Sequence, residues 1–277
     1  MNYRHESKQA LKRARAALES NDDENLKYAA LELRMAMESL TYDRANAYKD
    51  EFPPDEYETW QPRKVMAVLL AIDATADKGS TISYGIEETP GQPTSQMTML
   101  GTETVLNMET LRRHYDALGS FLHVPTLKQT KSGKRHDPGK LRIRCTEIAE
   151  FIDKVLTSQV HNVTLGKFAT IECAECGKPI RKRMPTVTET VEAECFSCKA
   201  SYTIKDIGGG QVHWDSHIHE VACGNKDCSH KIQIWRREFA VGVTWICPDC
   251  GGQNTITYGL RHEPSQSSAS AEQESSE

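Results

Sequence analysis

Apolar residues recur at helical spacing through the first 160 residues of the chain. From Asp23 onward they follow one another in alternating steps of four and three, which places them on one face of a helix. These positions are Leu26, Ala30, Leu33, Met37 and Leu40. A helix with a single apolar face packs that face against other elements, so this segment predicts one wall of a helical core.

Two later segments show the same spacing together with signals for helix ends. Residues 107–124 have Asn107 as an N-cap and end at Pro125, since the residue before proline avoids the helical region. Another helix begins at Pro138, with Asp137 as its cap. Their predicted buried stripes are Leu111, Tyr115, Leu118 and Leu122 in the first, and Leu141, Cys145, Ile148, Ile152 and Val155 in the second.

The remainder of the N-terminal half contains two more helical segments and one that is not helical. Residues 4–20 and a shorter stretch that begins near Pro62 continue the helical spacing. Residues 80–101 contain prolines and glycines at short intervals, which favours a hairpin or loop inserted between helices. Cys145 lies within an apolar stripe, so we expect a buried thiol that behaves as a small hydrophobe. The pattern predicts an N-terminal helical bundle with a small hairpin insertion.

The C-terminal half has a different pattern, in which cysteines occur as close pairs in two similar blocks. The first block has two residues within each pair and eighteen between the pairs, at Cys173, Cys176, Cys195 and Cys198. The second has four residues within its first pair, two within its second and again eighteen between, at Cys223, Cys228, Cys247 and Cys250. Apolar positions also match, as Ile171 with Val221, Ile180 with Ile232, Val191 with Val243 and Ile204 with Ile256. This self-similarity indicates an internal duplication.

The cysteine spacing indicates metal binding. Two intervening residues let both thiolates of a pair point at one ion across a tight turn, and two such turns complete a tetrahedron of sulfur at about 2.3 Å. Gly177 and Gly251 directly follow a pair and give the turn its backbone freedom. The eighteen intervening residues suit two strands and a turn, with a third strand after the last pair. The blocks resemble zinc ribbons over residues 168–260, which implies two structural Zn²⁺ ions; rubredoxin-type iron is the alternative.

Composition agrees with a soluble globular protein. Hydrophobic residues make up 38% and charged residues 26% of the 277 positions. No apolar run approaches the roughly 20 residues that span a bilayer, and the N-terminus has no apolar core of a signal peptide. We therefore expect a cytoplasmic protein, and in that reducing setting the nine cysteines favour metal over disulfides.

Basic side chains are concentrated in short segments, although the net charge is −5. Residues 128–144 hold seven basic side chains and one acidic, whereas residues 162–262 hold 12 basic and 11 acidic. Near the cysteines, we interpret two basic clusters as nucleic-acid contacts, namely Lys178, Arg181, Lys182, Arg183, Lys231, Arg236 and Arg237. Each zinc ion bound by four thiolates adds a net charge of −2, which opposes the binding of phosphate groups. We therefore keep a protein partner as an alternative to nucleic acid.

Two segments of the helical half, ALELRMAMESLTYDRANAY and HYDALGSFLHVP, carry leucines at helical spacing. Over residues 24–158 the chain thereby resembles the HEPN-like domains of prokaryotic defence and toxin systems, which implies a non-catalytic helical domain that forms a homodimer. The ribonucleases of that family keep an arginine a few residues before a histidine, whereas nine residues separate Arg113 from His123 here. The alternative is a ribonuclease, toxin or defence effector with its site on one polar helix face, at Arg112, Asp116 and His123.

These patterns together predict an α+β protein of several domains. The domains are a helical, HEPN-like domain over residues 1–160, zinc ribbons over residues 161–208 and 209–262, and a disordered acidic, serine-rich tail over residues 263–277. We interpret the chain as a zinc-binding adaptor, not an enzyme, whose tandem ribbons bind nucleic acid or a protein partner.

Overall fold

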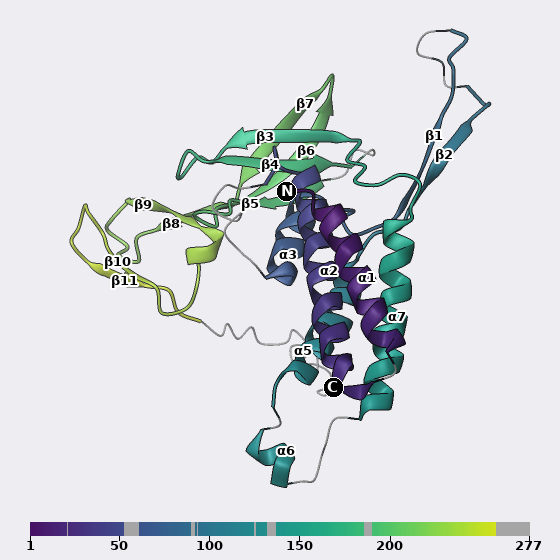
Figure 1. Ribbon diagram of the computed structural model, residues 1–277. Coiled ribbons are helices and arrows are strands. Elements are labelled where there is room, and N and C mark those ends of the chain that lie inside the picture. The colour runs from purple at the N-terminus through teal and green to yellow at the C-terminus, as the bar shows by residue number, and fades with distance from the viewer. Residues whose placement is uncertain are drawn as a thin grey trace, which may run out of the picture.

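Figure 1 shows a computed structural model of the chain, with helices in the N-terminal half and small antiparallel sheets in the C-terminal half. The structure describes residues 1–20, 22–52, 61–89, 92, 94–124, 126–131, 137–185 and 190–258. The predicted acidic tail, Pro125 and part of the basic segment 128–144 lie outside these ranges. The described chain is therefore mixed α+β, as predicted, and none of its helices is long and apolar enough to cross a membrane.

Four of the helices begin close to the predicted positions. They are α1 (Tyr3–Glu19), α2 (Leu26–Ala47), α3 (Pro62–Ile72) and α7 (Pro138–Leu156). The apolar stripes predicted for α2 and α7 are buried at every position. Helix α2 lies in the middle, in contact with α1, α3, α5 and α7 (Figure 1). The core of the N-terminal half thus forms around α2.

Helix α7 illustrates how local signals determine a helix. Its cap Asp137 accepts a hydrogen bond from the backbone N–H of Lys140 at 3.2 Å, and Pro138 occupies the first turn, as predicted. Cys145 is completely buried on the inner face, and burial raises the pKa of its thiol to about 11. The prediction of a buried, apolar cysteine is confirmed.

The helix predicted over residues 107–124 contains a wider turn. It consists of α4 (Met108–Thr110), a π-helical turn η3 (Leu111–Tyr115) and α5 (Asp116–Leu122). The predicted cap is confirmed, because Asn107 accepts a hydrogen bond from the N–H of Thr110 at 2.7 Å. Three of the four stripe residues are buried, while Leu122 is buried only in part. Residues spaced four and three apart lie on one side of the helix whether a turn is α-helical or π-helical. The sequence spacing therefore does not reveal the single π-helical turn.

The predicted insertion is a hairpin of β1 (Ser80–Tyr84) and β2 (Thr98–Glu103), which extends away from the helices (Figure 1). Its base is fixed by a buried ion pair, in which Arg44 Nη1 lies 3.2 Å from Glu103 Oε1. The short helices η1 (Asp23–Asn25) and α6 (Leu127–Lys131) complete the helical half.

The C-terminal half consists of paired strands that turn at the cysteines. The strands are β3 (Lys167–Glu172), β4 (Pro179–Met184), β5 (Thr190–Glu194), β6 (Ser201–Gly208), β7 (Gln211–Ser216), β8 (Ile218–Ala222), β9 (Lys231–Trp235), β10 (Thr244–Ile246) and β11 (Gln253–Thr255), with the short helix η4 (Arg236–Glu238) after β9. They pair as β3–β4, β5–β6–β7, β8–β9 and β10–β11.

This pairing corrects one expectation. The two strands between the cysteine pairs, β4 and β5, do not pair with each other; each pairs instead with the strand on the other side of its adjacent cysteine turn. The reason lies in the cysteine turns, whose own backbone hydrogen bonds continue into these ladders: the N–H of Cys173 donates to the C=O of Lys178 at 2.9 Å, and the N–H of Cys195 donates to the C=O of Ala200 at 2.8 Å.

The duplication seen in the sequence is matched by the strand register. Ile171 pairs with Ile180 across β3–β4, and at the equivalent positions Val221 pairs with Ile232 across β8–β9. Val191 likewise pairs with Ile204 across β5–β6. In the second block the N–H of Ile256 donates to the C=O of Val243 at 2.9 Å. The matched apolar residues are therefore cross-strand partners, which explains why they recur together.

Candidate metal centres

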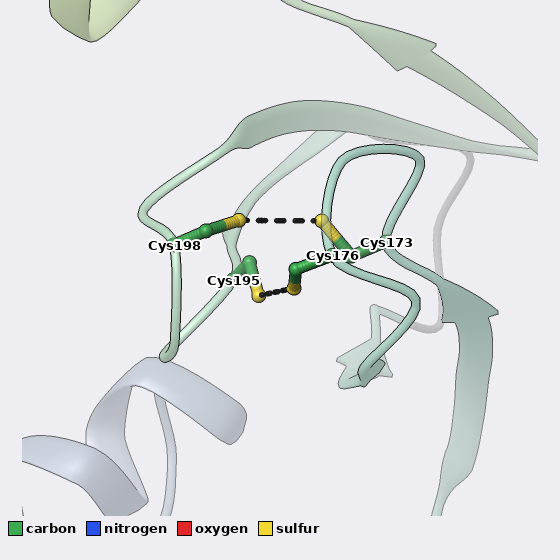
Figure 2. Close-up of side chains that lie close together, drawn as sticks. All are labelled: Cys173, Cys176, Cys195 and Cys198. Atoms are coloured by element: carbon green, nitrogen blue, oxygen red, sulfur yellow. Dashed lines mark hydrogen bonds between the residues drawn. The ribbon is translucent and has the colours of Figure 1, made fainter.

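The first cysteine cluster lies where two hairpin turns meet (Figure 2). Cys173 and Cys176 come from the turn between β3 and β4, and Cys195 and Cys198 from the turn between β5 and β6. The Sγ atoms of Cys173 and Cys198 lie 3.5 Å apart, and those of Cys176 and Cys195 lie 3.6 Å apart. All four sulfur atoms lie within 4.8 Å of one another.

The second cluster repeats this arrangement with the turns of β8–β9 and β10–β11. The Sγ atoms of Cys223 and Cys250 lie 3.7 Å apart, as do those of Cys228 and Cys247. These four sulfur atoms also lie within 4.8 Å of one another. The longer spacing between Cys223 and Cys228 is accommodated by an additional turn, in which the N–H of Cys228 donates to the C=O of Asn225 at 3.0 Å.

Both clusters have the size of a four-sulfur metal site. A tetrahedral ion with metal–sulfur bonds of about 2.3 Å requires sulfur atoms roughly 3.8 Å apart. Two sulfur–sulfur separations in each cluster, of 3.5–3.7 Å, are close to this value, and the others are at most 4.8 Å. Each group could therefore hold one metal ion, and its donor set is consistent with zinc.

Three of the four cysteine turns share one backbone conformation. The residue after the second cysteine of the pair has a positive φ, which is +70° at Gly177, +64° at Lys199 and +69° at Gly251. In each turn its N–H donates to the C=O of the first cysteine at 2.9 Å. This left-handed conformation favours glycine, so the role predicted for Gly177 and Gly251 is confirmed.

Two residues that support the clusters were missed in the sequence. The Tyr202 hydroxyl lies 3.3 Å from Cys173 Sγ and accepts a hydrogen bond from the N–H of Ala174 at 2.9 Å. In the second block Asn254 Oδ1 accepts from the N–H of Gly224 at 2.7 Å and lies 3.6 Å from Cys223 Sγ. Tyr202 and Asn254 both stand four residues after the last cysteine of their block. A polar side chain at the same position of both copies is the sequence feature from which this supporting role could be predicted.

Hydrogen bonds favour the thiolate form of one ligand in each cluster. Burial opposes ionisation of Cys173, but hydrogen bonds from the Tyr202 hydroxyl and from the backbone of Cys176 and Glu175 lower its pKa to about 6. A backbone hydrogen bond from Gly252, supported by neighbouring thiols, lowers the pKa of Cys250 to about 7. Burial and hydrogen bonds with Glu175 and neighbouring thiols raise the pKa of Cys198 in the same cluster as Cys173, so ionisation is uneven among the four sulfur atoms, and a metal ion would bind them as thiolates.

Histidines near the clusters have other partners. His213 Nε2 lies 2.9 Å from Asp215 Oδ1, and His230 Nδ1 lies 3.1 Å from Asp249 Oδ2. His217 Nε2 lies 2.6 Å from the hydroxyl oxygen of Thr203. In the ranges that the structure describes, no other group of three or more His, Cys, Asp or Glu side chains gathers its ligand atoms as the cysteines do.

Arg183, predicted as a nucleic-acid contact, joins the first block to the helical half. Its Nη1 lies 2.6 Å from Asp73 Oδ2 at the end of α3, and Asp73 is only 1% exposed. Tyr48 also donates to Asp73, at 2.7 Å, and so does the hydroxyl of Thr75, at 2.7 Å. Although burial opposes the charge, hydrogen bonds from Thr75, Tyr48 and Arg183 lower the pKa of Asp73. The guanidinium thus balances a buried carboxylate.

The two preceding residues of β4 contact the same region. Arg181 Nη2 lies 3.1 Å from Glu51 Oε1, and its guanidinium lies over the ring of Phe168. Lys182 Nζ donates to the backbone carbonyl of Ala71 in α3, and burial lowers its pKa. The charge cluster predicted from the sequence is therefore used for contacts within the chain.

The second predicted basic cluster is partly engaged as well. Lys231 Nζ lies 2.6 Å from Glu220 Oε1, and Arg237 Nη2 lies 2.5 Å from Glu175 Oε1, which lies in the first cysteine turn. Lys178 also has an interaction partner. Among the described residues, only the side chain of Arg236 in this predicted set has no hydrogen bond or ion pair.

The polar helix face of the catalytic alternative is not assembled into a cluster. Asp116 Oδ2 pairs with Arg63 Nη1 of α3 at 2.8 Å. His123 follows the end of α5 in an extended conformation and is exposed, as is Arg112. No hydrogen bond or ion pair joins Arg112, Asp116 and His123 within the described chain. The catalytic reading of these residues stays a prediction.

Fold and site together define a mixed α+β protein with two four-cysteine groups suited to metal ions. Comparison with protein-family models, with curated proteins and with solved structures finds no match for this chain.

Proposed function

We propose that the chain is a zinc-stabilised adaptor protein, with two structural Zn²⁺ ions and no catalytic centre. The observation that carries this proposal is the closed donor set, since each cluster offers four sulfur atoms that lie within 4.8 Å of one another. Four sulfur ligands complete the coordination of zinc, whereas catalytic zinc sites keep a position open for water or substrate. When bound, each ion supplies folding energy.

The small cores of the cysteine blocks support a structural role for the ions. Over residues 218–258, Ile234 and Cys247 are the apolar side chains that are buried. Such a core is too small to offset the loss of chain entropy by itself. Zinc binding to sites of this kind contributes on the order of 10–16 kcal/mol of apparent free energy. The strand register shared by both blocks supports tandem zinc ribbons as their architecture.

A protein partner agrees better with the charges than nucleic acid does. Arg181, Lys182 and Arg183 face the helical half, and Arg237 faces the first cysteine turn. Phosphate binding depends on basic groups whose charge is not already balanced. Trp214 and Trp235, which could stack on bases if exposed, pack against the core of the first block and contact the ring of Tyr202.

Metal analysis of the purified chain tests the structural role. We expect two equivalents of zinc by mass spectrometry, and one equivalent for variants in which Cys195 or Cys247 is replaced by serine. Iron in place of zinc would change the identity of the ion, whereas fewer than two equivalents of any metal would contradict the proposal. Exhaustive chelation should abolish near-ultraviolet circular dichroism from Trp214 and Trp235.

A binding titration separates the two kinds of partner. Fluorescent single-stranded and duplex oligonucleotides are titrated with the zinc-loaded chain at low and physiological salt. We expect weak binding that vanishes at physiological salt and does not depend on sequence. Tight, sequence-dependent binding that Arg236→Ala reduces would favour nucleic acid instead.

A further inference from the structure

Strand β5 forms one edge of the sheet β5–β6–β7, and among the described residues it pairs only with β6. Along an antiparallel strand, successive residues direct their N–H and C=O groups alternately toward the partner and away from it. The N–H of Cys195 donates to the C=O of Ala200 at 2.8 Å, so Ala193 also faces β6. Glu192 and Glu194 therefore direct their backbone groups outward, away from β6.

A groove of about 710 Å³ lies beside β5. The consecutive residues Glu192, Ala193 and Glu194 all line it. Ser201 of β6, which pairs with Glu194, lines the same groove, so the groove lies over the sheet face on which Glu192 and Glu194 stand and borders the backbone of β5. The volume is in the range of clefts that bind ligands. An open strand edge beside such a groove offers backbone hydrogen bonds to an additional extended strand.

One wall of the groove is apolar and belongs to both halves of the chain. Helix α3 contributes Ala67, Val68 and Ala71, and Phe196 comes from the second cysteine turn of the first block. Phe196 is partly buried and packs against the helical core. The wall therefore depends on the contact between α3 and the first metal centre.

The polar part of the groove has one positive charge without a partner. The Thr203 hydroxyl donates to Glu192 at 3.0 Å, and Lys199 Nζ lies 3.5 Å from Glu194 Oε1, so both acidic side chains have partners. Arg236 from η4 lines the groove and has no hydrogen bond or ion pair from its side chain to any described residue. A carboxylate is the group that a guanidinium binds most specifically.

We propose that an extended peptide segment of a partner protein binds along β5 as an added strand. Its backbone pairs with the outward groups of Glu192 and Glu194, an apolar side chain contacts the wall formed by α3 and Phe196, and a carboxylate binds Arg236. This inference rests on the proposed adaptor function and names the chemistry of its partner. Edge strands that are short and charged resist unspecific pairing, so specificity comes from the two side-chain contacts.

A library of random heptapeptides, displayed on phage and selected on the zinc-loaded full chain, tests the inference. Enriched sequences are synthesised with a fluorophore, and their Kd values are measured by anisotropy. We expect them to share an apolar residue and a carboxylate on alternate sides of the strand. Glu192→Pro removes an outward N–H while leaving the ladder to β6 intact, and should weaken binding at least about tenfold. Arg236→Ala should weaken binding by a similar factor.

Two variants provide matched controls. Thr190→Pro removes the outward N–H at the other end of β5, outside the groove, and should leave the Kd unchanged. Glu192→Ala keeps the backbone N–H and should also bind normally. The inference is wrong if no peptide is enriched, if enriched peptides bind Glu192→Pro as tightly as wild type, or if an oligonucleotide occupies the groove and displaces them.

Zinc content measured on the same samples separates the two proposals. If the chain holds two equivalents of zinc but enriches no peptide, peptide binding along β5 is refuted and the structural role of zinc stands. If the chain lacks zinc but binds peptides, and Glu192→Pro weakens that binding, peptide binding along β5 is supported and the proposed zinc-stabilised adaptor is refuted. Failure of both measurements refutes both.

Discussion

Arg183→Ala separates the two roles that sequence and structure suggest for the basic residues of β4. In the structure, Arg183 balances the carboxylate of Asp73, which is 1% exposed, and it also donates to Thr75 Oγ1 at 3.0 Å. Removing the guanidinium leaves Asp73 with its hydrogen bonds from Tyr48 and Thr75 but without a balancing charge. We therefore expect a loss of stability at the contact between β4 and α3.

The magnitude follows from the exposure of the two partners. Truncating one member of a fully buried ion pair costs about 3–5 kcal/mol. The Arg183 side chain is 28% exposed, so water screens part of this interaction. A hydrogen bond to a charged group contributes about 1.5–3 kcal/mol, and we expect a loss of roughly 2 kcal/mol.

Urea unfolding of the zinc-loaded protein, followed by far-ultraviolet circular dichroism, measures this loss. Arg236→Ala is the matched control, because Arg236 belongs to the same predicted set but its side chain has no hydrogen bond or ion pair with the residues that the structure describes, and its unfolding midpoint should equal that of wild type. If Arg183→Ala unfolds at the wild-type midpoint and instead loses oligonucleotide binding, the reasoning from the ion pair is wrong.

The same ion pair makes a pH-dependent contribution. Hydrogen bonds lower the folded-state pKa of Asp73, so its contribution is fully present above the unfolded pKa of about 4 and disappears as pH falls through the lower folded value. Acid also releases zinc from thiolates, so the relevant quantity is the difference between wild type and Asp73→Asn. That difference should be constant between about pH 5 and 7 and shrink below about pH 4.

Two further substitutions test the metal centres. Gly177→Ala should destabilise the zinc-loaded chain by about 1 kcal/mol in urea unfolding, because φ is +70° there and a Cβ meets no atom within 4 Å, so only backbone strain acts. Gly139→Ala, in the first turn of α7, is its control: φ is not positive there, and the new Cβ would meet only the Asp137 side chain at 3.3 Å, so the variant should lose less stability than Gly177→Ala. Tyr202→Phe should lower zinc affinity of the first site about tenfold and spare the second, measured by competition with a chromogenic chelator; equal loss at both sites would refute the specific role of the hydroxyl.

The elements that could be predicted from the sequence are those determined by nearby residues. Asp137 and Pro138 start α7, and the spacing of the cysteines defines the two metal centres, because in each case the interacting groups are close in sequence or repeat at a fixed interval. Which strands pair was predicted less well, since alternation identifies a strand but not its neighbour.

The partners that the basic residues have within the chain could not be predicted for a related reason. The sequence shows Arg181, Lys182 and Arg183 as a local group of charges, whereas Asp73 lies 110 residues before Arg183. Periodicity and composition contain no information about such long-range pairs. The functions of Tyr202 and Asn254 were open to prediction, since the duplication places both at the same distance from a cysteine.

Strand β4 directly follows the first cysteine turn, so the contacts of its basic side chains depend on whether that turn is folded. Zinc binding should therefore affect how the chain binds polyanions. Cys176 and Arg181 are five residues apart, and the turn that holds the sulfur atoms also sets the register that directs Arg181 to Glu51 and Arg183 to Asp73. Without zinc the turn loses the free energy that orders it, and these side chains no longer have fixed partners. We expect chelated protein to bind single-stranded RNA at low salt more tightly than zinc-loaded protein, with Arg181→Ala and Arg183→Ala together abolishing the increase. RNA binding that is unchanged by chelation would show that these arginines are already accessible in the folded chain, and would contradict the docking of β4 on α3.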